Sequence, residues 1–299
     1  MKIVSTRQVP TGHILIGEGE KGLLEFLSLG DYGKEKNLKA DFLGLPDEIN
    51  GVPHGDLLPL TEKWVITIST QYGCSMGCSF CDVPKVGPGR NATKQDLIDQ
   101  VLLALELHPE IQQTKRLNIH FARMGEPSFN DDVIAATFWL KQNIGHIHHI
   151  HPVVSTMCPK TNASLQYFLE KWMLIKNFHL KGEAGLQLSI NSTNEKEREN
   201  MFGGHALSLR EISRIVSHFD VVGRKIALNF ALADFEIDEK KLITHFNPDK
   251  FLIKITPMHN TSASIENKHT TKDGYDLFYP YKEVEARLKK VGFDVIIFI

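Results

Sequence analysis

The chain has 299 residues, 42% of them hydrophobic, which is enough to bury the core of one large α/β domain. Its net charge of −2 excludes a strong positive field over the whole surface, although a local basic patch could still meet nucleic acid. The four cysteines do not suit a secreted disulfide scaffold, and no run resembles a signal peptide or a membrane span. We therefore expect a cytoplasmic protein with reduced thiols and no membrane segment.

The first 60 residues are broken repeatedly by Gly and Pro and predict a small β-containing extension, residues 1–60, before a barrel domain, residues 61–299. From residue 64 onward, short apolar runs alternate with segments of helical periodicity, which is typical of β/α units around a parallel sheet. The expected strands are 64–70, 116–122, 149–155, 185–190, 225–231 and 251–256, with DVIIFI as a possible seventh. The expected helices are 94–107, 131–142, 164–175, 209–219, 239–246 and 281–292, with N-caps at Thr93, Asn130 and Ser208.

Two polar segments and one set of basic residues accompany these elements. Residues 259–275 are long enough to form a functional loop after a strand. The run from Glu195 to Glu199 is typical of a solvated helical face with mixed charge pairs. A local basic lip for phosphate, or ordinary solvated surface, is expected at Lys85, Arg90, Lys94 and Arg123.

The strongest chemical signal is the C-x3-C-x2-C spacing of Cys74, Cys78 and Cys81, directly after the first barrel strand. Thiolates are soft ligands for zinc or iron–sulfur clusters, and a structural zinc site would need a fourth ligand. Three thiolates on a 4Fe-4S cluster leave one iron open for another ligand. With Phe80 before the last cysteine, the motif resembles the signature of the radical S-adenosylmethionine (SAM) superfamily, and a zinc knuckle or a fortuitous thiol cluster is the alternative.

Polar residues also follow later strands. Gly125 and Glu126 end the second strand and could offer close backbone approach and a carboxylate, Ser155 ends the third, and Ser189-Ile190-Asn191 ends the fourth. Barrel enzymes place their active sites at these strand ends, although turn-forming residues occur there too.

Six segments in order resemble the RlmN/Cfr family of radical SAM RNA adenine methyltransferases: QYGCSMGCSFC, GRNATKQDLIDQV, RMGEPSFN, VVSTM, LSINSTNEKERENMF and KITPMHN. The resemblance implies an α/β fold of the partial TIM-like (β/α)6 type, a 4Fe-4S cluster on the three cysteines, and SAM. The implied SAM contacts are Gly125, Glu126, Ser155, Ser189, Ile190, Asn191 and either His259 or Asn260. Asn191 stands where the family usually has histidine.

Two departures concern the chemistry. The family uses one cysteine near the C-terminus and another seven residues before the cluster motif, where this chain has Thr67. The chain ends at DVIIFI, short of the expected Cys-Gly segment, which suggests truncation. The remaining thiol, Cys158, is a candidate catalytic residue, as hydrogen donor, resolving thiol or substrate anchor, or else a small buried side chain.

The resemblance implies reductive cleavage of SAM to a 5′-deoxyadenosyl radical, with a flavodoxin or ferredoxin as electron donor and RNA or a nucleotide base as substrate. The alternatives are a radical SAM enzyme acting on a peptide, protein or small metabolite, and a noncatalytic iron–sulfur redox sensor. The sequence does not set the oligomeric state.

Overall fold

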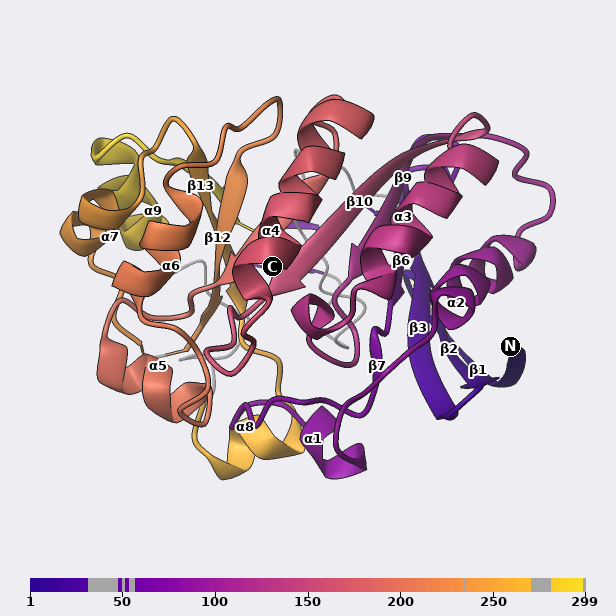
Figure 1. The fold of residues 1–299 in the computed structure, drawn as a ribbon, viewed down its shortest axis with the longest axis horizontal. Helices are drawn as coiled ribbons and strands as arrows, with labels where there is room; N and C mark the ends of the chain where they lie inside the picture. Colours follow the sequence, from indigo (N-terminus) through magenta and orange to yellow (C-terminus); the bar gives the residue numbers. More distant parts are fainter. Residues whose placement is uncertain (32–47, 50–51, 54–56, 234, 270–280, 298–299) are drawn as a thin grey trace. The chain divides into compact units, whose positions relative to one another are not determined.

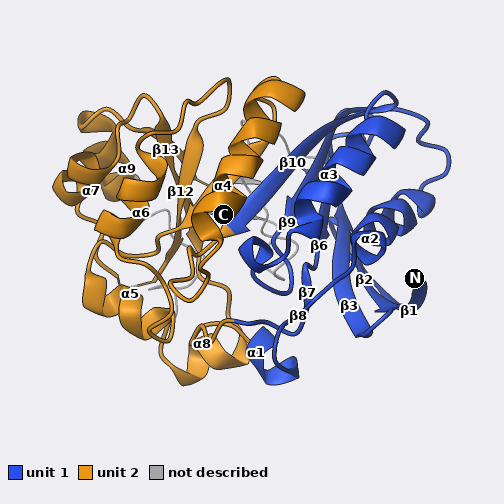
Figure 2. Cartoon of the chain, viewed as in Figure 1, with its two compact units in different colours: residues 1–42, 55–75, 83–155 blue, residues 43–54, 76–82, 156–299 orange. Residues whose placement is uncertain are grey.

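The computed structural model describes residues 1–31, 48–49, 52–53, 57–233, 235–269 and 281–297. Its contacts divide the chain into two compact units, coloured separately in Figure 2. Residues 1–42, 55–75 and 83–155 form the first unit, and residues 43–54, 76–82 and 156–299 form the second. The boundary between an extension of residues 1–60 and a barrel of residues 61–299 stays a prediction.

The first unit contains an antiparallel meander joined to parallel strands. β1 (Lys2–Val9), β2 (Gly12–Gly19) and β3 (Gly22–Leu29) pair antiparallel in that order, and β3 pairs antiparallel with β6 (Trp64–Ile68). β6 then pairs parallel with β9 (Thr114–Phe121), and β9 pairs parallel with β10 (His148–Thr156). The predicted β-containing extension and the first three barrel strands are therefore present, although residues 32–47, 50–51 and 54–56 of the extension lie outside the described residues.

Two long helices connect these parallel strands. α2 (Lys94–Glu106) packs against β3, β6 and α3 (Asp132–Asn143), and Figure 1 shows the two helices side by side. The predicted N-cap Thr93 is confirmed, since its side chain and that of Asp96 form a capping box. At the start of α3, Asp131 directly precedes the helix and makes no capping bond with its side chain, whereas the predicted cap Asn130 accepts from the Asp132 amide with its Oδ1 at 3.1 Å. The Asn130 Nδ2 also donates to the carbonyl oxygens of Thr70 and Ala92, both at 2.8 Å.

Shorter elements of this unit flank the cysteine motif in the sequence. α1 (Val83–Val86) follows the motif, and β7 (Gln71–Tyr72) pairs antiparallel with β8 (Arg90–Asn91). A short 3-10 helix, η2 (Pro127–Phe129), follows the Gly-Glu turn.

The second unit contains four parallel strands in chain order: β11 (Gly185–Ser189), β12 (Ile226–Leu232), β13 (Phe251–Pro257) and β14 (Asp294–Ile297). β14 confirms the possible seventh barrel strand. A separate antiparallel pair is formed by β4 (Glu48–Ile49) and β5 (Val52–Pro53). The barrel strands of both units are largely buried, as parallel strands with covered faces are.

Helices alternate with the strands of the second unit. α4 (Leu165–Leu174) continues into a π-helical turn, η3 (Ile175–His179), and α5 (Glu195–Met201) and α6 (Leu209–Val216) follow β11. α7 (Glu239–His245), α8 (Ser262–Glu266) and α9 (Tyr281–Lys290) complete the set of Figure 1. The predicted cap Ser208 is confirmed by a capping box with Glu211. Of the polar stretch 259–275, residues 270–275 lie outside the described residues.

Among the described residues, no helix is both long and apolar enough to cross a membrane.

Lys176 lies in η3 with its side chain fully buried and its ammonium donating to the Val222 carbonyl oxygen. Burial, followed by the nearby charge of Arg224, lowers the lysine pKa from 10.5 to about 8. The unfolded chain therefore binds this proton more readily than the folded one between those two values. The destabilising effect is fully present below the folded pKa and disappears as pH rises through the window.

Lys176→Met is expected to raise the free energy of unfolding at neutral pH by about 1 to 2 kcal/mol, because a buried charge is replaced by an apolar side chain of similar length. The advantage should shrink as pH rises from about 8 to about 10.5. Urea unfolding of the cluster-free variant and parent across this range measures the difference. A pH-independent difference between the two proteins would contradict the assignment.

Candidate functional site

The cysteine motif begins in the first unit with a loop held against residues 87 and 88. The Cys74 amide donates to the Gly87 carbonyl oxygen at 3.2 Å, and Cys74 forms an isolated parallel bridge with Pro88. Gly73 has a φ of +76°, and a Cβ at this position would lie 2.2 Å from the Gly87 oxygen. Only glycine therefore allows the chain to turn this closely into the motif.

Gln71 links the start of this loop to the turn after β9. Its Oε1 accepts from the Ser75 amide and from the Glu126 amide, both at 3.1 Å. Its Nε2 donates to Ser75 Oγ at 2.9 Å and to Asn91 Oδ1 at 2.8 Å. Gln71 was not among the predicted site residues, and the available signals were its place directly after a strand and at the start of the segment QYGCSMGCSFC.

The Gly125-Glu126 turn lies against Gln71 as a tight, buried corner. Glu126 is 4% exposed, and its Oε1 accepts from the Ser128 amide at 3.0 Å as the cap of η2. Gly125 has a φ of +92°, and a Cβ there would lie 2.5 Å from Gln71 Cβ and 2.7 Å from its backbone nitrogen. The glycine is thus required by both the backbone conformation and the close approach.

Gly125→Ala is expected to lower the free energy of unfolding by about 3 kcal/mol, from left-handed strain together with the collision against Gln71. Gly204→Ala is the matched control: its φ is +74°, yet nothing lies within 4 Å of the added Cβ. We expect that control to cost about 1 kcal/mol. Equal losses for the two variants in chemical denaturation would show that the close approach to Gln71 contributes nothing.

The other two cysteines belong to the second unit. Cys78 and Cys81 are both half-buried, and the Cys81 amide donates to the Cys78 carbonyl oxygen at 3.2 Å. The Cys78 sulfur lies 3.7 Å from Met157 Sδ. Phe80 packs edge-on against Phe202, with ring centroids 5.9 Å apart. The aromatic residue of the motif therefore anchors the loop while the thiols stay partly accessible.

The residues after β11 are held by the neighbouring strand. The amides of Ile190 and Asn191 donate to the Asn229 carbonyl oxygen at 2.8 and 3.2 Å. Asn191 has a φ of +61° and is 2% exposed, with its Oδ1 accepting from the Ala231 amide at 2.8 Å and its Nδ2 3.2 Å from Met201 Sδ. Ser189 is half-buried. The Asn191 side chain is therefore occupied in fixing this turn.

A buried arginine supports the same turn from α5. Arg198 is 1% exposed; its guanidinium donates to the carbonyl oxygens of Ile190 and of Leu207, the latter at 2.9 Å, and lies over the Phe202 ring. Burial lowers its pKa to about 10, which keeps it charged at neutral pH. The expectation of a solvated face over residues 195–199 is therefore wrong at Arg198, because this helix turns one charged side chain inward.

Cys158 lies in a turn that follows β10. It is 1% exposed with a φ of +56°; its amide donates to Thr156 Oγ1 at 3.0 Å and its carbonyl accepts from the Leu207 amide at 2.9 Å. Pro159 forms an antiparallel bridge with Ala206. The thiol is thus part of a closely packed turn, and its catalytic role stays a prediction.

The remaining predicted residues lie at strand ends. Ser155 is half-buried near the end of β10, and His259 and Asn260 are both exposed after β13; their contacts with SAM stay predictions. Thr67, at the family's cysteine position, is half-buried within β6 and pairs with Leu27 and His120.

Two of the four basic residues of the predicted phosphate lip have partners within the first unit. Arg123 forms an ion pair with Glu25, and Arg90 donates to the Lys21 carbonyl oxygen at 2.6 Å and lies over the Tyr72 ring. These contacts favour ordinary surface for Arg123 over a phosphate site.

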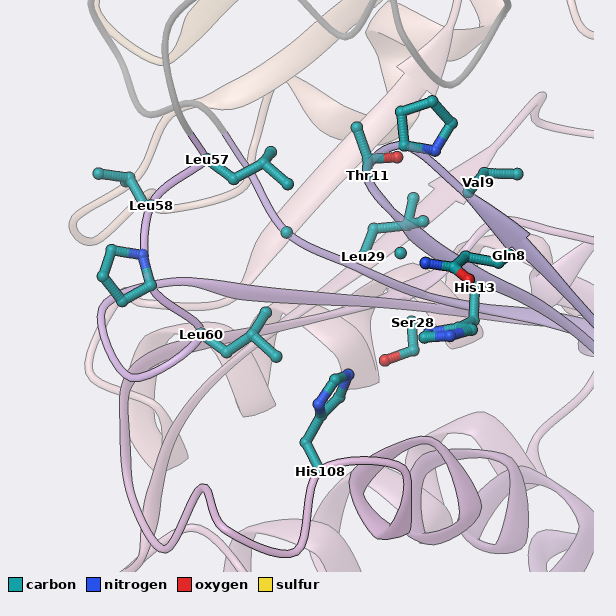
Figure 3. A pocket seen from close by; sticks show the side chains of 14 residues that line it. Gln8, Val9, Thr11, His13, Ser28, Leu29, Leu57, Leu58, Leu60 and His108 are labelled. Carbon is teal, nitrogen blue, oxygen red and sulfur yellow. The ribbon is translucent and has the colours of Figure 1, made fainter.

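A cavity of about 310 Å³ lies elsewhere in the first unit, between β1, β2 and residues 57–60. His13, Ser28 and His108 border it together with apolar side chains such as Leu57 and Leu60 (Figure 3). None of the predicted site residues lines this cavity, so it carries none of the chemistry expected from the motif.

The donor set suits an iron–sulfur cluster. All four cysteines are outside disulfides, and those of the motif are half-buried while Cys158 is fully buried. Among the described residues, no three His, Cys, Asp or Glu side chains lie together as a group that could hold a metal ion, so the fit rests on the chemistry and accessibility of the three thiols. Three partly accessible thiols on a loop that turns at Gly73 match the soft ligands such a cluster needs.

Comparison with known proteins relates the chain to one family. No family model matches it. A Nostoc punctiforme protein named probable dual-specificity RNA methyltransferase RlmN is 26% identical over 226 residues, 72% of this chain and 57% of that protein. A protein of the same name from another Nostoc is 36% identical over 228 residues, 74% of this chain and 59% of its own length. The chain is an RlmN-like member of the radical SAM superfamily. It spans less than two thirds of the length of these relatives.

Solved structures confirm the fold class of this RlmN-like chain. A radical SAM methyltransferase from Sphaerobacter thermophilus matches with a TM-score of 0.67 and 18% identity, over 99% of this chain and 76% of that one. Streptococcus suis SuiB, solved with its precursor peptide SuiA, matches with a TM-score of 0.52 and 14% identity, over 78% of this chain and 47% of that one. The predicted α/β fold of the partial TIM-like type is confirmed.

Proposed function

We propose that this chain is a radical SAM enzyme that holds a 4Fe-4S cluster on Cys74, Cys78 and Cys81 and cleaves SAM reductively. The observation that carries the proposal is the C-x3-C-x2-C loop of an RlmN-like chain, with three thiols that are partly accessible and outside disulfides. When bound, such a cluster supplies one electron to the SAM sulfonium, which releases methionine and a 5′-deoxyadenosyl radical. Reduced thiols of this kind suit the cytoplasm.

The residues after the strands would bind SAM. The carboxylate of Glu126, whose Oε1 caps η2, would accept from the ammonium of the methionine moiety, because an ionised carboxylate has several acceptor sites. Gly125 brings the backbone close, and the hydroxyls of Ser155 and Ser189 can bond the carboxylate and the ribose.

Asn191 would support SAM binding indirectly and would not contact SAM itself. Its side chain is engaged by Ala231 and Met201, so we assign it to holding the Ile190 backbone in place. His259 or Asn260 would complete the set.

The substrate proposal is RNA or a nucleotide base, supported by the relatives named as RNA methyltransferases. Thr67 cannot perform the thiol chemistry of the cysteine that the family has at this position. The proposal therefore covers the cleavage of SAM and the class of substrate, and it does not include methyl transfer to the base. A flavodoxin or ferredoxin would supply the electron.

Anaerobic reconstitution with iron and sulfide, followed by dithionite and SAM, tests the core of this proposal. Mass spectrometry should detect 5′-deoxyadenosine that depends on both the reductant and the cluster. RNA and a peptide pool are then compared for the yield and for a mass change. A loaded cluster that never yields 5′-deoxyadenosine would overturn the enzyme proposal in favour of a redox sensor, and a mass change confined to peptide would overturn the RNA substrate.

A further inference from the structure

The second half of the cysteine loop is fastened to the segment after β13 by its acidic residue. Asp82 directly follows Cys81, and its two carboxylate oxygens accept from the backbone amides of Ser262 at 3.0 Å and Ala263 at 2.9 Å. Hydrogen bonds from amides to an ionised carboxylate are stronger than those between neutral groups. One side chain therefore joins two segments 180 residues apart in the sequence.

Three further bonds reach the residues between Cys78 and Cys81. Thr261 Oγ1 donates to the Phe80 carbonyl oxygen at 2.7 Å, and Asn267 Nδ2 donates to the Ser79 carbonyl oxygen at 2.9 Å. Ser79 Oγ lies 2.7 Å from His269 Nε2. Both carbonyl groups inside the C-x2-C turn are thus bonded by residues 261–269, which we call the clasp.

The clasp is itself ordered locally. Thr261 forms a capping box with Ser264 at the start of α8. Ser264 Oγ also donates to the His259 carbonyl oxygen at 2.8 Å, so the clasp holds the backbone of one of the two residues proposed for the SAM contact. A rigid support of this kind can position a neighbouring loop without touching its ligand.

The loop is also held from the C-terminal end of α5. The Ser79 amide donates to the Met201 carbonyl oxygen at 2.9 Å. A Cβ on Gly203 would lie 2.6 Å from the Gly77 carbonyl oxygen, so the backbones approach closely there. The clasp and residues 201–203 therefore both hold the backbone that carries Cys78 and Cys81, and none of these bonds uses a cysteine sulfur.

We propose that Asp82 is the principal positioning residue of the cluster loop, acting through the clasp to hold Cys78 and Cys81 ready for iron. This inference rests on the proposed function, since it concerns the same three cysteines. The thiols keep their chemistry without Asp82, yet each would be presented by a looser backbone. The effect should therefore be a faster loss of cluster with the iron ligands still in place.

The first measurement uses cluster-free protein and does not depend on iron. Alkylation of each cysteine by iodoacetamide is followed by tandem mass spectrometry in the parent chain and in Asp82→Ala. We expect Cys81 to react about tenfold faster in the variant, because two charge-assisted bonds are lost. Cys74, held by Gly87 in the first unit, and the buried Cys158 should be unchanged and serve as internal references.

The second measurement reconstitutes the cluster and follows its release to an iron chelator through its visible absorbance. Asp82→Ala should load iron and release it about tenfold faster than the parent, and Asp82→Asn, which keeps one oxygen acceptor, should fall between. Asp249→Asn, an exposed acidic residue elsewhere in the same unit, should behave as the parent. Asn267→Ala, which removes only two bonds of the clasp, covers the case in which Asp82→Ala does not fold.

The outcomes separate the two proposals. Faster Cys81 alkylation in a chain that never binds iron would support the clasp and reject the cluster. Normal cluster formation with equal release rates in the parent, Asp82→Ala and Asn267→Ala would reject the clasp and leave the cluster. Cys81 alkylation that is unchanged in all the variants would likewise overturn the positioning role.

Discussion

Cys78→Ala is expected to leave the reconstituted chain with background iron and sulfide and with no reductant-dependent 5′-deoxyadenosine. The three motif cysteines are the only thiols that the sequence places together, and two protein ligands do not retain a four-iron cluster. Cys74→Ala and Cys81→Ala should behave in the same way. Iron and sulfide analysis, together with the visible spectrum, measures the loss directly.

Cys158→Ala is the matched control, because it removes the fourth and last thiol of the chain from a fully buried position. It should keep the parent's iron content and visible spectrum. Loss of iron from this variant would instead indicate four protein ligands, and parent-like iron in Cys78→Ala would refute the ligand assignment.

Arg198→Leu is expected to lower the free energy of unfolding by about 3 kcal/mol, as large a loss as we expect for Gly125→Ala. Its guanidinium bonds the carbonyl oxygens of Ile190 and Leu207 and is 1% exposed. Leucine fills part of the volume but removes the guanidinium donors from both buried carbonyl groups, although the Ile190 oxygen still accepts from the Ser192 amide at 2.8 Å. The same substitution should weaken SAM binding, since Ile190 lies in the proposed SAM turn.

Arg210→Leu, an exposed position in α6, provides the comparison for the loss of a positive charge and should change stability by less than about 0.5 kcal/mol. Denaturant unfolding of the cluster-free proteins gives both numbers. If the two variants lose the same amount, the carbonyl bonds of Arg198 contribute nothing to stability.

The barrel strands could be predicted from the sequence because each is a short buried run between helical segments. In β12 and β13, for example, at least every second residue is buried. Both strands coincide with the expected strands to within one residue. The helix starts at Thr93 and Ser208 were predictable because a capping box needs only residues three apart. Local patterns of this kind can be recognised in the sequence without knowledge of the tertiary fold.

The supports of the candidate site could not be predicted in the same way. Arg198 lies within a run of charged residues, and its burial depends on carbonyl groups that the turns at Ile190 and Leu207 supply. Gln71 gains its role from partners 4, 20 and 55 residues away. A single sequence shows the ligand types at the cysteines, whereas these contacts arise only when distant turns meet.

The antiparallel strands at the start of the chain make β6, the strand that leads into the cysteine loop, an interior strand of the sheet. β6 has β3 on one side and β9 on the other, so its backbone groups face partners at both edges. Without β3, the apolar run at Val65 and Ile66 would become an open sheet edge, which is the kind of surface that recruits strands from other molecules. By covering this edge, the N-terminal meander therefore protects the strand before the cysteine loop from edge-to-edge aggregation.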